Sequence, residues 1–187
     1  MNRLRQVILI PATLLGSWLG MQLVHESGHV LGAWMTGARV TRVVLHPLTI
    51  SRTDIAQNPY PLVVVWCGPI LGAAVPLLIW AAVARTDWSG VFVLRFFAGF
   101  CLIANGLYIG LGSLDGVGDC GEMLLLGSPL WLLWLFGIST APLGFWIWHR
   151  QGRHFGLGKA NEQINPRVAY GSLFTCLALL ILGFAVG

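Results

Sequence analysis

The residues best placed to do chemistry in this chain are His25, Glu26 and His29, which form an HExxH pattern. Two histidines four apart on a helix share one face and lie about one turn apart, so both imidazoles can reach one metal ion. Glu26 projects from a neighbouring position, where a carboxylate can take a proton from water at the metal. The flanking residues 14–21 and 30–35 are mostly apolar. Three titratable side chains are costly in such surroundings unless metal or partners compensate them, which predicts a functional site.

A catalytic zinc site needs a third protein ligand and an open position for water. One familiar continuation of HExxH places a third histidine where this chain has Met35. Another places a glutamate on a following helix, but no glutamate occurs between Glu26 and Glu122. The remaining candidates are one histidine and six acids: His46, Asp54, Asp87, Asp115, Asp119, Glu122 and Glu162.

Three of these acids, Asp115, Asp119 and Glu122, lie in the glycine-rich stretch 113–124 directly after an apolar segment. Glycine lets the backbone approach closely and adopt unusual angles, so an acid there can enter a site at membrane depth. An ordinary interfacial turn is the alternative explanation of this stretch. The other acids lie in polar or basic loops, where they are more simply solvated charges: Asp54, Asp87 and Glu162.

The elements that must position these residues are membrane spans. The chain of 187 residues is 56% hydrophobic and only 10% charged, with a mean hydropathy of +0.76, whereas soluble domains have about 25% charged residues. A span needs about 20 apolar residues, and an apolar patch at 123–126 is too short. The sequence predicts an all-α polytopic membrane protein with about five transmembrane helices, at residues 7–35, 61–84, 91–111, 129–148 and 168–186.

The net charge of +4 does not indicate nucleic-acid binding, because the basic residues lie in loops and at the ends of apolar runs, where they meet the lipid bilayer. With the N-terminus on the inner side of the membrane, seven basic residues would lie on that side and three on the outer side. Because inner loops carry an excess of Lys and Arg, this count favours that orientation. The seven are Arg3, Arg5, Arg85, Arg150, Arg153, Lys159 and Arg167, and the three are Arg39, Arg42 and Arg52.

The four cysteines are scattered and predict neither a disulfide framework nor a cysteine zinc site.

The region 37–60 is more polar than the spans and has a strand-like part at 38–53. Residues 40–45 are rich in β-branched side chains, and residues 48–53 form a second strand-like piece. We predict a short β-hairpin-like segment after the first span, with an irregular interfacial loop as the alternative. A strand edge there would allow an extended substrate to pair with it.

Together these features resemble the site-2 protease family of intramembrane zinc metalloproteases, which carry HExxH on one transmembrane helix and an aspartate ligand in an Asp-Gly motif on a later one. Residues 25–29 match the first motif at every defined position, and residues 119–124 (DCGEML) match the second apart from its second position. Residues 67–72 (CGPILG) resemble the family's Gly-Pro motif, where small residues permit close helix contact. Asn105 resembles an asparagine that precedes the family's aspartate, although the usual intervening prolines are absent and the spacing to Asp119 is longer.

The resemblance implies one zinc ion per chain, Glu26 as the catalytic residue and Asn105 as a residue that positions substrate. Its metal ligands would be His25, His29 and Asp119, with Asp115 as the alternative third ligand and Glu122 or His46 after it. The substrate would be a transmembrane or membrane-proximal segment of another protein. The location would be the bacterial cytoplasmic membrane, crossed several times.

The resemblance divides a single integral membrane domain, 1–187, into two parts. Residues 20–126 would form the metalloprotease-like core, and residues 129–187 two additional spans joined by a basic loop at 149–167. The alternative function is a non-catalytic metal-binding membrane protein, either a pseudoprotease scaffold or a metal transporter or sensor. Glu26 argues against it, because a site that only binds metal does not need a general base.

Overall fold

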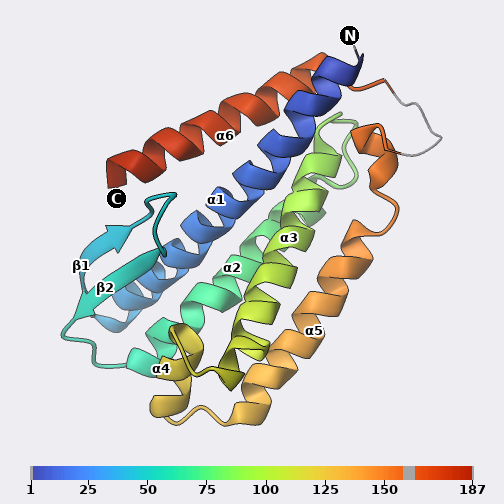
Figure 1. Cartoon of the computed structure of the whole chain (residues 1–187). Coiled ribbons are helices and arrows are strands. Elements are labelled where there is room, and N and C mark those ends of the chain that lie inside the picture. Colours follow the sequence, from blue (N-terminus) through green and yellow to red (C-terminus); the bar gives the residue numbers. More distant parts are fainter. Residues whose placement is uncertain (1, 158–162, 187) are drawn as a thin grey trace.

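The computed structural model describes residues 2–157 and 163–186, which form mainly helices and one small sheet (Figure 1). Lys159 and Glu162 lie outside these residues. Five described helices are long and apolar enough to cross a membrane, as predicted: α1 (Asn2–Thr36), α2 (Pro61–Val83), α3 (Val91–Gly110), α5 (Leu130–Trp148) and α6 (Pro166–Val186). The shorter elements are the helix α4 (Asp119–Leu125) and the 3-10 turns η1 (Gly112–Leu114) and η2 (Gly152–Phe155).

Helix α1 ends at Thr36, and the next residue, Gly37, has a φ of +76° that favours glycine. The amide of Ala38 donates to the Ala33 carbonyl at 2.8 Å, and that of Gly37 donates to the Trp34 carbonyl at 3.4 Å. This pair of bonds is a Schellman motif, which satisfies carbonyls that the last helical turn leaves free. The chain therefore turns back beside the HExxH end of α1.

The predicted hairpin is present as two antiparallel strands, β1 (Arg39–Val44) and β2 (Arg52–Ala56). The predicted position of the second strand, 48–53, is wrong by several residues. Pro47 has no amide hydrogen for a strand ladder, and the Thr49 amide closes a turn on the His46 carbonyl at 3.0 Å. Pairing therefore resumes only at Arg52.

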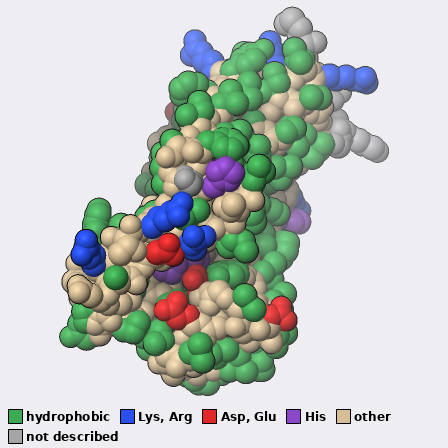
Figure 2. Space-filling view, turned by 60° about the vertical axis from the view of Figure 1, so that its left-hand side comes forward, with side chains coloured by type: hydrophobic (Ala, Val, Ile, Leu, Met, Phe, Trp, Pro, Cys, Tyr) green, Lys and Arg blue, Asp and Glu red, His purple; other side chains and the backbone are tan. Residues whose placement is uncertain are grey.

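The long helices pack in a row, with α1 between α6 on one side and α2 and α3 on the other, and α5 against the far side of α3 (Figure 1). The sheet and α4 lie at one end of this bundle, and the N-terminus lies at the opposite end. Hydrophobic side chains are widespread on the face in Figure 2, as expected of helices that contact lipid. The HExxH segment, in the C-terminal half of α1, thus lies toward the end that carries the sheet and α4.

The apolar patch 123–126 does not span but anchors α4 in the bundle. Met123 and Cys120 are completely buried and cluster with Val65 of α2, Ile109 of α3 and Leu133 of α5. Because α4 begins at Asp119, this packing fixes the position of the first residue of the helix as well.

Candidate metal centre

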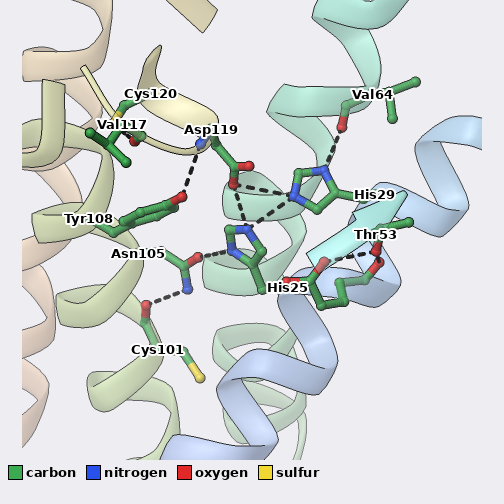
Figure 3. Close-up of polar contacts among 11 residues, drawn as sticks. His25, His29, Thr53, Val64, Cys101, Asn105, Tyr108, Val117, Asp119 and Cys120 are labelled. Carbon is green, nitrogen blue, oxygen red and sulfur yellow. Dashed lines mark hydrogen bonds and ion pairs between the residues drawn. The ribbon is translucent and has the colours of Figure 1, made fainter. Parts of the chain in front are cut away.

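His25 and His29 of α1 meet Asp119, the first residue of α4, at one point (Figure 3). The two Nε2 atoms lie 3.1 Å apart, and Asp119 Oδ2 lies 2.8 Å from His25 Nε2 and 3.3 Å from His29 Nε2. Ligands of a tetrahedral zinc ion, with bonds of about 2.0–2.1 Å, lie about 3.3 Å apart. The three atoms therefore form a group that could hold a metal ion.

The Nδ1 atom of each histidine, on the side of the ring away from the metal-binding group, contacts an oxygen that only accepts hydrogen bonds. His25 Nδ1 donates to Asn105 Oδ1 at 2.7 Å, and His29 Nδ1 donates to the Val64 carbonyl at 3.0 Å. Once Nδ1 carries the proton, the Nε2 atom of a neutral imidazole presents a lone pair. Two lone pairs and a carboxylate oxygen then converge, an arrangement that a cation satisfies and that fixes both ring orientations.

The glycine-rich stretch before α4 positions Asp119. Gly116 and Gly118 have φ values of +62° and +67°, which side chains disfavour, and the turn that they form delivers Asp119 to the site. The Asp119 amide donates to the Tyr108 hydroxyl at 3.0 Å. Burial raises the pKa of the Asp119 carboxyl, but hydrogen bonds donated by the protonated Nε2 atoms of His25 and His29 outweigh burial and hold that pKa well below its usual range. A cation bound among the three atoms would take the place of those protons and, like them, favour the ionised carboxylate.

The Gly-Pro motif of α2 makes room for the side chains of the metal centre. A Cβ atom at Gly68 would overlap His29 Nε2, and one at Gly72 would lie 2.8 Å from Asn105 Oδ1. A Cβ atom at Gly28 of α1 would lie 2.5 Å from the Cys67 carbonyl oxygen. Glycine at these positions lets α1, α2 and α3 approach closely enough for the imidazole and amide to meet.

Glu26 lies beside the metal-binding group without belonging to it. Glu26 is only 3% exposed, and its Oε2 accepts a hydrogen bond from the Thr53 hydroxyl of β2 at 2.8 Å. The small sheet therefore contacts the HExxH glutamate directly. Glu26 also lines the cavity that contains the three metal-binding atoms, so it can act on a molecule bound there.

The site opens into a cavity of about 850 Å³. Helices α1, α2 and α3, residues 49–55 of the hairpin region and the start of α4 line it. Acidic and histidine side chains gather in the hollow seen in Figure 2 beside the arginine-bearing hairpin. A cavity of this size admits a polypeptide segment and not only a metal ion and water.

No protein-family model, curated protein or solved structure matches this chain. The resemblance to the site-2 protease family therefore rests on the motif residues themselves.

The other candidate ligands lie outside the metal-binding group among the described residues. Asp115 is exposed, and Glu122 is exposed although it lines the cavity. His46 packs against Phe184 of α6, with ring centroids 4.9 Å apart. Two of the remaining acids also lie apart from it: Asp54 pairs with Arg52, and Asp87 is exposed between α2 and α3. Glu162 falls outside the described residues.

Asn105 is bound into the metal centre rather than turned toward a free part of the cavity. The side chain is 1% exposed, and its Nδ2 donates to the Cys101 carbonyl at 2.9 Å while Oδ1 faces His25. Its role in positioning substrate stays a prediction. The sequence analysis missed Thr53 and Tyr108, because no motif links either residue to partners 27 and 11 positions away.

Proposed function

We propose that this protein is an intramembrane zinc metalloprotease that hydrolyses a peptide bond in a transmembrane or membrane-proximal segment of another protein. The observation that carries the proposal is the convergence of His25, His29 and Asp119 beside a buried glutamate in a large cavity. Two imidazoles and one carboxylate are a ligand set that catalytic zinc uses, and the set leaves a position open for reaction.

Glu26 favours catalysis over metal binding alone. A carboxylate that is nearly buried, and bonded at one oxygen to Thr53, is expensive to keep at membrane depth. A site that only stores or transports metal would gain little from it. When bound, zinc would act as a Lewis acid and make water reactive at neutral pH.

Glu26 can then serve as the general base and the general acid. Its carboxylate accepts one proton as the water oxygen forms a bond to the peptide carbonyl carbon. As the carbon–nitrogen bond breaks, Glu26 returns that proton to the leaving amine, and the products are a carboxyl and an amine. The Thr53 hydroxyl, which donates to one carboxylate oxygen, orients the other for this transfer.

The substrate must reach the metal as an unwound chain, because helical peptide groups are hydrogen-bonded and covered by their side chains. The hairpin region lines the cavity along residues 49–55, so it could contact an extended segment. Five helices of suitable length support a multi-pass membrane protein, and we assign it to the bacterial cytoplasmic membrane as the resemblance implies.

The test is zinc content and proteolysis of the protein purified in detergent, using fluorescently labelled casein as the substrate. Wild type should carry one zinc ion per chain and cleave casein, and Glu26→Gln should keep the zinc but lose cleavage. Asp119→Ala should lose both, whereas Asp115→Ala should keep both. Zinc retained by every variant, or cleavage by Glu26→Gln, would contradict the proposal. Stoichiometric zinc without cleavage by wild type would favour a non-catalytic metal-binding protein.

A further inference from the structure

Gln22 lies on the cavity face of α1, close to one turn before the metal centre. Together with Trp18, His25 and His29 it forms a stripe at helical spacing, and all four side chains line the cavity. Gln22 is only 7% exposed, so its amide lies at depth. The stripe extends from the two histidines toward the middle of the membrane-spanning helix.

The amide oxygen of Gln22 is buried and has no hydrogen-bond partner among the described residues. Asn105, the other buried amide in the cavity, is bonded at both ends, to His25 and to the Cys101 carbonyl. A buried amide without a partner costs free energy that a hydrophobic residue of the same size would not. Because Gln22 also lines the cavity, a molecule that enters the cavity could supply the missing partner.

We propose that Gln22 binds the backbone of the unwound substrate, next to the bond that is cleaved; this rests on the proposed proteolytic function. An amide offers one acceptor and one donor group, which complement the N–H and C=O groups of an extended peptide. Those backbone groups lose their helical partners when the segment unwinds, and the membrane interior offers no water to replace them. Met21 and Trp18 beside Gln22 give the substrate side chains an apolar surface.

The matched control is Gln151, which lies after the end of α5 and directly before η2. Its amide oxygen is also buried without a partner among the described residues, but Gln151 does not line the cavity. Replacing either glutamine by methionine keeps the length of the side chain and removes its hydrogen-bonding groups. A general effect of losing a buried amide would therefore appear in both variants.

The test measures how tightly the zinc-loaded protein in detergent binds two hydroxamates by calorimetry. Acetohydroxamate reaches only the metal, whereas the hydroxamate of N-acetyl-leucyl-alanyl-leucine adds peptide groups beside it. Gln22→Met should weaken the peptide hydroxamate about tenfold, as expected for one or two lost hydrogen bonds, and leave acetohydroxamate unchanged. Gln151→Met should change neither.

Equal weakening of both hydroxamates by Gln22→Met would show that Gln22 acts on the metal centre and would overturn the proposal. Unchanged binding of the peptide hydroxamate, or the same loss in Gln151→Met, would also overturn it. Because the assay measures binding, it separates the two proposals. Wild-type protein that binds both hydroxamates but cleaves no casein would contradict proteolysis. The binding of the peptide hydroxamate by Gln22→Met and wild type would still show whether Gln22 contacts the peptide groups.

Discussion

The α1–α2 and α3–α5 crossings are both packed through glycine, but the glycines make room for different groups. In α2, Gly68 lies under the imidazole of His29. In the α3–α5 crossing, a Cβ atom at Gly144 would lie 2.7 Å from the carbonyl oxygen of Gly99, which is backbone. Close approach serves a functional side chain at the first crossing and only helix packing at the second. Substitutions at the α1–α2 crossing should therefore change zinc affinity, whereas substitutions at the α3–α5 crossing should change stability.

The largest effect is expected from Gly68→Ala. The added methyl group would overlap His29 Nε2, an atom of the metal-binding group, while the Val64 carbonyl holds the other side of the ring at 3.0 Å. Zinc affinity should fall by about 100-fold or more, as for severe disruption of groups that orient a ligand. Competition with a zinc chelator in detergent measures it. The control is Gly171→Ala in α6, where a Cβ atom meets open space; equal zinc affinity in both variants would contradict the comparison.

A somewhat smaller loss is expected from Asn105→Leu. This change removes the acceptor of His25 Nδ1, so the ring is no longer held with Nε2 toward the metal. Zinc affinity should fall about 10- to 100-fold. Asn105→Asp keeps an acceptor oxygen and should retain more of the affinity than Asn105→Leu, in the same chelator competition. If both variants bind zinc like wild type, the hydrogen bond does not orient His25.

Most of the fold could be predicted from the sequence because each span carries its own apolar run. The five spans and the hairpin follow from local composition, whereas the first span begins earlier than predicted and β2 lies several residues later. Its position depends on how the turn at His46 and Pro47 closes, which β-propensity does not reveal. The Asp-Gly stretch likewise pointed to Asp119, which the structure brings to the histidines.

The surroundings of the metal-binding group could not be predicted in the same way. Asn105 meets His25 across 80 residues, and Thr53 meets Glu26 across 27. Such contacts depend on the crossing of separate helices and on the fold of the hairpin, so they leave no periodic signal in the chain. From the sequence, Gly68 and Gly72 predicted only close contact between helices. That they make room for the side chains of His29 and Asn105 follows from the structure alone.

A kinetic effect without loss of metal is expected from Thr53→Val, because the hairpin contacts the site through Glu26 rather than through a metal-binding atom. Removing the hydroxyl leaves the glutamate oxygen without its donor, and kcat should fall about tenfold, less than the roughly 100- to 10,000-fold that general acid–base catalysis contributes as a whole. Zinc content should match wild type, and Thr53→Ser should recover most of the rate of casein cleavage. A fall in zinc content would instead tie the hairpin to the metal-binding group.

The smallest effect on the metal centre is expected from Gly144→Ala, which probes the second crossing. The methyl group would press on the Gly99 carbonyl and on Ile103, so α3 and α5 must separate slightly. Overpacking of this kind costs about 1–3 kcal/mol of stability, and thermal unfolding in detergent should shift to a lower temperature. Zinc bound per folded chain should stay at the wild-type value, because α5 contributes no atom to the metal-binding group. A loss of zinc as large as that of Gly68→Ala would mean that the α3–α5 crossing also sets the position of Asn105, and the two crossings would no longer be separable.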